Sequence, residues 1–217
     1  ECWVYGRFRA PHGVAVAQGT AAFELGPVRR AVSVFGPRRW TGRLVRTLSD
    51  PTPVTEVPIG WDRAFGAPGV AENPFGLGVS ASADGSVEAP QVEDPQHLIA
   101  GPDDRPPPAG FAPLPLTLPA RLPLAGTYTG AWATTRWPWM PADFSPSLYL
   151  SSPEGQRVAG YWRGDEVFAL RNLVEGAPLV RGALPVQQAR VGIEAPDGEG
   201  RALPLQLDSV VVDSDAR

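Results

Sequence analysis

The chain has 217 residues, including 26 prolines and 24 glycines, and a net charge of −4. All 19 basic residues are arginine, which excludes a P-loop, a Schiff-base lysine and a lysine general base within this sequence. The acidic balance argues against sequence-independent nucleic-acid binding. The single cysteine, Cys2, and the two histidines, His12 and His97, exclude an internal disulfide and argue against a His/Cys-rich zinc site. We therefore expect no metal and no cofactor.

Residues 1–50 are strand-rich. Short β-favouring runs alternate with breaks that contain glycine, at His12-Gly13, Gly26-Pro27 and Gly36-Pro37. This spacing predicts antiparallel strands with tight connections. The runs are residues 3–5, 14–16, 22–25 and 31–35.

Residues 51–155 differ in texture, because they hold 19 of the 26 prolines and 10 of the 19 aromatic residues. Prolines at that density interrupt helices and central strands, whereas a disordered linker would lack the aromatic side chains. We predict an ordered, irregular segment that aromatic side chains fix to the sheet. Short helices are expected around residues 126–135 and 141–150, and a mobile polar loop over residues 79–90.

Residues 156–217 return to strands, which we expect at 157–162, 166–173, 179–184, 188–194 and 203–212, with a turn at Pro196-Asp197-Gly198. The predicted fold is mainly β: one antiparallel β-sandwich-like domain over residues 1–217. A long Pro/aromatic-rich irregular excursion separates its two strand-rich halves. Because the sequence opens at Glu1, we expect a domain excised from a longer chain.

Two motifs that could suggest chemistry have the wrong surroundings. Residues 76–81 match the G-x-G-x-x-A dinucleotide fingerprint, but Asn73-Pro74 precedes them where a strand is required, and no helix follows. His97 follows Glu93-Asp94 and fits a turn-capping role better than that of a catalytic base. Neither motif predicts a cofactor site.

Acidic residues leave a hydrolase open as an alternative. Asp94, Asp104 and Asp165 stand in acidic clusters, and a glycosidase needs two converging carboxylates. Each of the three fits a structural role in a turn better. We therefore expect no catalytic residue, and no intrinsic hydrolase or transferase activity.

The most unusual composition is a cluster of tryptophans with one arginine, at Trp132, Arg136, Trp137 and Trp139. Protein interfaces are enriched in these residue types, so the cluster is our candidate protein-binding site. The alternative is that the rings form a small core that holds the excursion in place, and both can hold together. We expect Trp132 and Arg136 on one helix face, Trp137 and Trp139 extended in one direction, some rings buried, and Trp139 exposed.

The order of several short runs along nearly the whole chain resembles the bacterial family called domain of unknown function 2169. Three positions depart from the family pattern, at Ala67, Gln91 and Thr129. The runs are Trp3-Val4-Tyr5-Gly6, Ala10-Pro11, Arg63-Ala64-Phe65-Gly66, Asn73-Pro74-Phe75-Gly76-Leu77-Gly78, Glu93-Asp94-Pro95, His97-Leu98-Ile99, Asp104-Arg105-Pro106, Pro108-Ala109-Gly110-Phe111, Gly126-Thr127-Tyr128, Trp132, Arg136-Trp137-Pro138, Pro141-Ala142-Asp143-Phe144, Gly160-Tyr161, Arg163-Gly164-Asp165-Glu166 and Asn172-Leu173.

The resemblance implies an accessory role in type VI secretion and brings no catalytic residue with it. It implies a cytoplasmic, non-catalytic adaptor or chaperone that binds a secreted effector and helps load it onto the secretion spike. The expected partners are the effector and the spike protein, with no nucleic acid and no membrane insertion. The alternatives are the hydrolase with clustered carboxylates and a purely structural module fused to a repeat domain.

Overall fold

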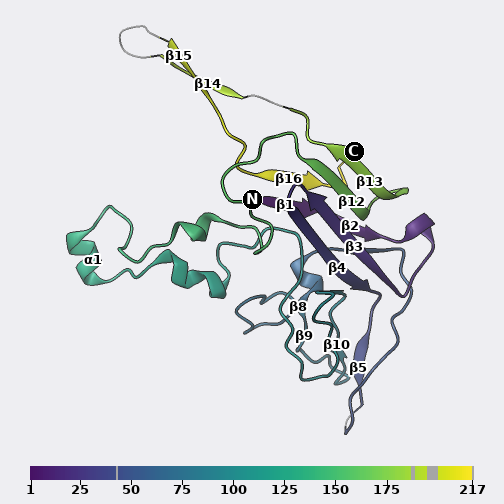
Figure 1. Cartoon of the computed structure of the whole chain (residues 1–217). Coiled ribbons are helices and arrows are strands. Elements are labelled where there is room, and N and C mark those ends of the chain that lie inside the picture. The colour runs from purple at the N-terminus through teal and green to yellow at the C-terminus, as the bar shows by residue number, and fades with distance from the viewer. Residues whose placement is uncertain (43, 187–188, 195–199, 217) are drawn as a thin grey trace.

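The computed structural model describes residues 1–42, 44–186, 189–194 and 200–216, and it consists mainly of β-strands (Figure 1). Its largest sheet has five antiparallel strands in the order β11-β4-β3-β12-β13. This confirms the predicted mainly β fold with antiparallel pairing. The five strands are β11 (Val92–Glu93), β4 (Val28–Phe35), β3 (Gln18–Leu25), β12 (Val167–Val174) and β13 (Ala177–Ala183).

The strands β3 and β4 form a hairpin whose turn follows from the sequence. Leu25 pairs with Val28, so only Gly26 and Pro27 lie between the strands. Gly26 has a φ of +52°, in the left-handed region that glycine adopts without strain. The break expected at this dipeptide is therefore the turn itself.

A second layer covers one face of the large sheet. It consists of β1 (Cys2–Tyr5) with β16 (Val210–Asp213), and of β2 (Arg7–Arg9) with β7 (Glu56–Pro58). The pair β1–β16 is parallel, which we did not expect. Parallel neighbours need a long connection, and here almost the whole chain lies between the two strands, so local turn signals could not reveal the pairing.

The hydrophobic core lies between these two layers. The sheet contributes Phe23 and Val32, and the second layer contributes Phe8 and Val57. Phe111, from the irregular segment, packs edge-on against Phe23 with ring centroids 5.0 Å apart. Burying an aromatic or aliphatic side chain of this size contributes about 1.5–3 kcal/mol. At Phe111 the irregular segment is therefore fixed to the sheet as predicted.

The remaining elements of the first two regions are short. They are η1 (Pro11–Gly13), β5 (Arg39–Thr41), β6 (Thr47–Leu48), η2 (Trp61–Arg63), β8 (Phe65–Gly66), β9 (Leu77–Gly78), β10 (Val87–Glu88), η3 (Pro119–Ala125), α1 (Gly130–Thr135) and η4 (Pro146–Tyr149). Of the two expected helices, the first is the six-residue α1 and the second is only a 3-10 turn. Prolines on either side of these elements limit their length. No helix in the described ranges is both long and apolar enough to span a membrane.

Residues 79–90 were expected to form a polar loop, and half of that expectation is wrong. Val87 and Ala89 are buried in a small second core with Trp40 and Ile99. Strand β10 pairs with β5 in the same region. Val87 lies among small polar residues, so the sequence around it has no periodic signal. Its burial depends on Trp40, which is distant in sequence.

The last region also differs from expectation in places. Residues 157–162 form no strand and contribute one isolated bridge, between Trp162 and Leu207. Where we expected one strand over 203–212, the structure has parts of two: β15 (Gly200–Pro204) ends at a proline, and β16 begins at Val210. Strand β14 (Arg190–Glu194) pairs with β15 in an exposed hairpin. Gln188 and the turn predicted at 196–198 lie outside the described residues.

Candidate protein-binding site

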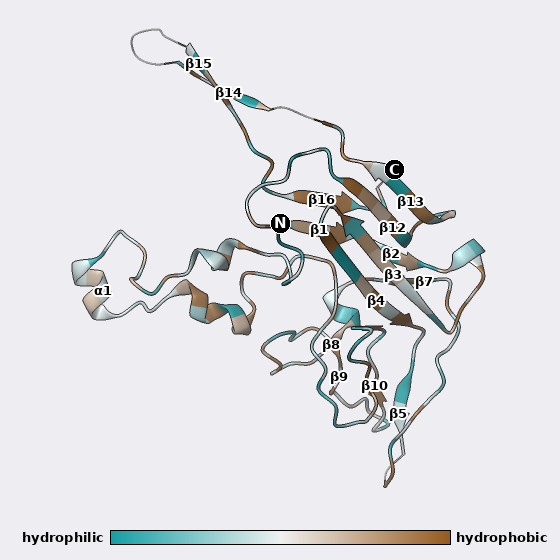
Figure 2. Cartoon of the chain, viewed as in Figure 1, coloured by the Kyte–Doolittle hydropathy of each residue, from teal (hydrophilic) through white to brown (hydrophobic). Residues whose placement is uncertain are grey.

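Residues 114–151 leave the body of the protein and return to it at one place, and we call them the aromatic arm (Figure 1). Both ends meet where the N–H of Leu114 donates to the carbonyl of Ser151, 2.6 Å away. The arm carries only three charged residues, Arg121, Arg136 and Asp143. Figure 2 colours much of it white to brown, on the hydrophobic side of the scale. An exposed segment with so little charge has the composition of an interaction surface.

Arg121 holds the base of the arm together. Its guanidinium is buried and donates hydrogen bonds to the carbonyl oxygens of Leu148, Leu150 and Leu114, the last two at 2.9 and 3.4 Å. Burial lowers the pKa of Arg121, but an arginine stays charged at neutral pH. One planar donor group therefore joins the outgoing and returning limbs of the arm.

Further out, two more contacts join the limbs. The N–H of Ser145 donates to the carbonyl of Leu124 at 2.9 Å. The carboxylate of Asp143 accepts the hydroxyl of Thr127 at 2.6 Å and its backbone N–H at 3.0 Å. These two bonds from Thr127, the hydroxyl first, lower the pKa of Asp143. Hydrogen bonds thus join the two limbs at several points along the arm.

The tip of the arm is organised around Trp132. The side chain of Thr129 caps α1 by accepting the N–H of Trp132 at 3.2 Å. The Trp132 ring meets Tyr128 and Trp137 edge-on, with centroids 4.7 and 5.8 Å apart. Its indole N–H donates to the carbonyl of Trp139 at 2.9 Å. Trp132 is the half-buried centre of a small aromatic cluster, which matches the small-core alternative for this one ring.

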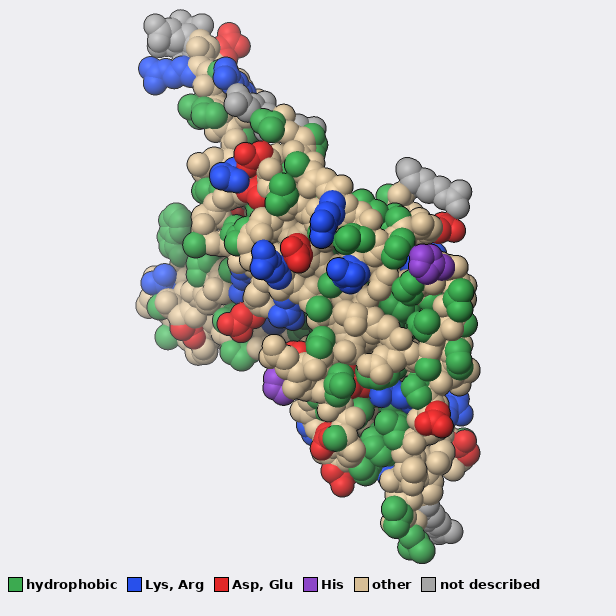
Figure 3. All heavy atoms as spheres, turned by 45° about the vertical axis from the view of Figure 1, so that its right-hand side comes forward, with side chains coloured by type: hydrophobic (Ala, Val, Ile, Leu, Met, Phe, Trp, Pro, Cys, Tyr) green, Lys and Arg blue, Asp and Glu red, His purple; other side chains and the backbone are tan. Residues whose placement is uncertain are grey.

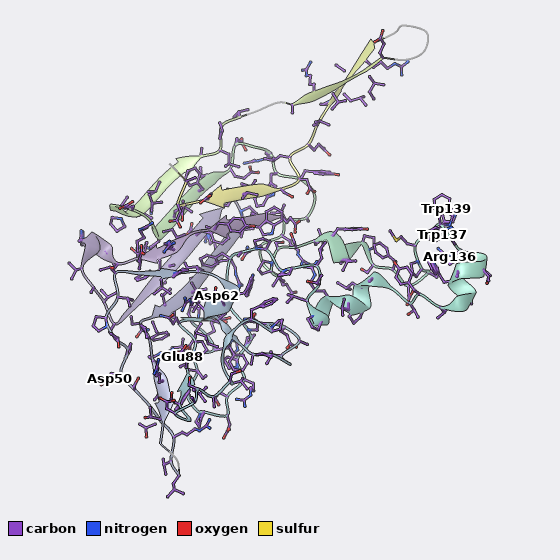
Figure 4. All side chains as sticks on the ribbon, turned by 180° about the vertical axis from the view of Figure 1, so that it is seen from behind. Asp50, Asp62, Glu88, Arg136, Trp137 and Trp139 are labelled. Carbon is purple, nitrogen blue, oxygen red and sulfur yellow. The ribbon has the colours of Figure 1, made fainter. Side chains whose placement is uncertain are left out.

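Trp137 and Trp139 lie in a turn at the far end of the arm, and they are 70% and 73% exposed (Figure 4). The exposure expected for Trp139 is observed. The extended course expected on both sides of Pro138 is wrong, because the N–H of Trp139 closes a turn onto the carbonyl of Arg136 at 2.7 Å. None of the three indoles is fully buried.

Arg136 is the C-terminal cap of α1. The helix ends at Thr135, and Arg136 follows it with a φ of −120° while its N–H donates to the carbonyl of Trp132 at 2.9 Å. Its Nε donates to the carbonyl of Met140 at 3.0 Å. Arg136 therefore closes the tip turn and presents the rest of its guanidinium beside the exposed indoles.

The carboxylates of the hydrolase alternative lie in three separate turns. Asp94 accepts the N–H of Gln96 at 2.8 Å, Asp104 accepts that of Gly101 at 2.7 Å, and Asp165 pairs with Arg163 at 3.1 Å. Each is occupied by a local partner, as expected of turn residues. Among the described residues, no group of three or more His, Cys, Asp or Glu side chains could hold a metal ion.

Asp94 does share a hollow of about 400 Å³ with a second carboxylate, Glu24. Glu24 pairs with Arg29 at 3.7 Å, and Asp94 lies 3.7 Å from the imidazole of His97. The carboxyl whose pKa burial raises, Glu93, contacts Arg38. The carboxyl with the raised pKa is therefore not one of the two that line this hollow.

The glycine-rich run after Asn73 allows close packing of the backbone. The buried Asn73 amide donates to the carbonyls of Trp61 at 2.7 Å and Phe65 at 3.0 Å. A Cβ on Gly76 would stand 2.5 Å from the carbonyl of Ala64, so only glycine fits. The run thus packs two backbone segments closely.

We did not predict from the sequence that Arg121 joins the two limbs of the arm. A signal for this role was present, because Arg121 is the only charged residue between 106 and 135. A lone arginine in an apolar stretch needs several acceptors if it is buried, and backbone carbonyls of the returning limb supply them. Two of its three acceptors, the carbonyls of Leu148 and Leu150, lie 27 and 29 positions away, and no local pattern identifies them.

Comparison with known proteins assigns a family. The family model described as uncharacterized protein conserved in bacteria (DUF2169) matches residues 1–217. Searches of curated proteins and of solved structures found no significant match.

Proposed function

The chain belongs to the bacterial family DUF2169, and from this premise we propose that it is a non-catalytic adaptor that binds a partner protein through the tip of its aromatic arm. The observation that carries the proposal is the exposure of Trp137 and Trp139 at the end of a cross-linked arm. Tryptophan and arginine dominate the binding energy of protein interfaces, and the tip presents both.

Preorganisation supports the arm as a binding device. Ordering a loop on binding costs about 0.5–1.5 kcal/mol for each immobilised long side chain. The bonds made by Arg121, Asp143 and Trp132 order the arm in the free protein, so less of that cost remains. The exposed indoles can then bury their surface against a partner with little loss of conformational freedom.

The resemblance to the type VI secretion-associated family suggests the partner. We propose that the tip binds a secreted effector in the cytoplasm, and that the adaptor then helps to load this effector onto the spike protein. The near absence of charge on the arm suits an apolar groove or helix face on the effector.

The test is affinity purification from the native cell with four forms of the protein: wild type, Trp137→Ala, Trp139→Ala and the control Tyr161→Ala. Tyr161 is exposed and lies outside the arm. Co-purified proteins are identified by mass spectrometry, and thermal unfolding is measured for each form. We expect both tip variants to lose one common partner without unfolding and the control to retain it. Equal recovery by all forms would place the interface elsewhere.

A further inference from the structure

The five-stranded sheet ends at β13, whose outer edge is unpaired among the described residues. The N–H of Leu184 donates to Glu166, so at this position the backbone points toward β12. Backbone groups in an antiparallel sheet alternate between the two neighbours. The backbone N–H and C=O groups of Leu179, Arg181 and Ala183 therefore point away from the sheet, where they can pair with another strand.

The usual protection of an edge strand is weak here. Natural edges are blocked by proline, by bulges or by charged side chains. Pro178 belongs to the residues of β13 whose backbone groups face β12, and it lies opposite the irregularity between Arg171 and Val174. The N–H that proline lacks is therefore not one of the outward-facing groups. In β13 only Arg181 carries a charge.

The outer face of the sheet is positively charged where it meets this edge. One cross-strand row runs Arg29, Glu24, Ala169, Arg181, and the next row brings Arg171 beside Leu179. Arg29 pairs with Glu24, whereas Arg171 and Arg181 have no carboxylate partner among the described residues. Figure 3 shows this face, with blue side chains around a red one. A net positive face on a protein of charge −4 favours an acidic partner.

We propose that β13 accepts an extended acidic segment of a partner protein as an added strand, with an acidic side chain opposite Arg181. The backbone of the segment pairs with Leu179, Arg181 and Ala183, and this gives affinity. The cationic face selects the sequence, because opposite charges across a strand pair stabilise it and like charges oppose it. This surface is separate from the aromatic arm, which extends from the other side of the sheets (Figure 1).

A second copy of this chain fits the edge less well. Antiparallel self-pairing around the middle of β13 would bring its own Arg181 opposite or diagonal to the first, with Arg171 of both copies on the same face. An acidic strand from another protein meets no such repulsion.

The probe is a labelled peptide, acetyl-Thr-Glu-Val-Glu-Val-Glu-Thr-amide, with a second peptide that has lysine in place of each glutamate. Binding is measured by fluorescence anisotropy at low salt. We expect the glutamate peptide to bind wild type at least about fivefold more tightly than the lysine peptide. Arg181→Glu should reverse this order. Arg201→Glu, a charge reversal of an exposed arginine on the β14–β15 hairpin, should leave it unchanged.

Backbone pairing is tested separately from charge. Ala183→Pro removes one outward N–H and should weaken both peptides in proportion. When the segment pairs antiparallel with a glutamate opposite Arg181, the glutamate N–H points toward β13 and the valine N–H points away. A peptide N-methylated at its central glutamate therefore tests backbone pairing on unaltered protein and should bind several-fold more weakly, whereas a peptide N-methylated at a valine is the control. Equal binding of the glutamate peptide to the Arg181→Glu and Arg201→Glu variants would overturn the proposal. So would equal binding of the two methylated peptides, tighter binding of a single-stranded oligonucleotide, or a wild-type dimer that Ala183→Pro dissociates.

Discussion

The indole N–H of Trp132 donates to the backbone carbonyl of Trp139 across the tip of the aromatic arm, at 2.9 Å. The two tryptophans therefore have opposite tasks. Trp132 is half-buried and holds the turn that presents Trp139, whose own ring faces solvent. Folding and binding at the tip can be separated by substituting one ring or the other.

Trp132→Phe keeps a ring at the centre of the cluster but removes the N–H, and Trp132→Ala removes both. We expect the tip to lose about 0.5–1.5 kcal/mol of local stability in the first variant. The second loses, in addition, two aromatic contacts of about 0.5–1.5 kcal/mol each. Hydrogen exchange of the backbone amides over residues 130–140 measures this local opening. Exchange as slow in Trp132→Ala as in wild type would contradict the central place of Trp132.

Arg121→Met should loosen the base of the arm. The substitution keeps an apolar stem but leaves carbonyls of Leu148 and Leu150 without their donor, at a cost of about 1–3 kcal/mol. We expect chymotrypsin to cut within residues 114–151 faster than in wild type. Arg105→Met is the control, because Arg105 is exposed and donates only to nearby backbone. Equal cleavage of the two variants would show that Arg121 does not join the limbs.

Thr127→Val should raise the pKa of Asp143 toward its ordinary value of 3.8, because the hydroxyl that stabilises the carboxylate is lost. A carboxyl with a lowered pKa stabilises the fold above its ordinary pKa, and this contribution is lost as the pH falls through the folded pKa. The contact between the limbs at Thr127 should therefore weaken below pH 3.8. The ¹³C shift of the Asp143 carboxyl, followed against pH in both forms, measures the change; identical curves would contradict it.

Arg38→Met should destabilise the protein by about 3–5 kcal/mol at pH 7, because it leaves the buried Glu93 carboxylate without its cation. Burial already raises the pKa of Glu93 above 4.5. A raised carboxyl pKa gives stability that is present below pH 4.5 and is lost as the pH rises through the folded pKa. The cost of the substitution should therefore shrink in acid.

Urea unfolding of Arg38→Met at pH 7 and pH 4 measures this difference. Arg39→Met is the matched control, because Arg39 forms an exposed pair with Glu88 at 3.1 Å. Such a pair contributes about 0–1 kcal/mol, so the control should change little at either pH. A cost for Arg38→Met that is the same at both pH values would show that Glu93 is not the group left unpaired.

The sequence predicted the parts of this fold that local chemistry determines. Two β-favouring runs with the Gly26-Pro27 break between them locate the β3–β4 hairpin. The mixture of prolines with aromatic residues identifies the irregular middle segment. The parallel β1–β16 pair and the burial of Val87 depend on partners far along the chain. Local periodicity carries no information about such partners.

The sequence predicted which residues make up the candidate site but not how they are arranged. Trp132, Arg136, Trp137 and Trp139 do gather at one tip, but the sequence did not reveal the turn that the N–H of Trp139 closes onto the carbonyl of Arg136. The hydrogen bonds that order the arm join residues well separated in sequence, from 16 positions for Thr127 and Asp143 to 29 for Arg121 and Leu150. Only the folded chain brings them together.

The central claim is that the exposed indoles of the tip bind a partner protein. Its most direct test is the dissociation constant for the partner that wild type captures, measured by calorimetry with purified wild type, Trp139→Ala and Tyr161→Ala. An interface tryptophan of this kind is worth about 2 kcal/mol or more, so Trp139→Ala should weaken binding about thirtyfold or more at unchanged thermal stability. The Tyr161→Ala variant should bind as wild type does. A Trp139→Ala constant equal to the wild-type value would contradict the account.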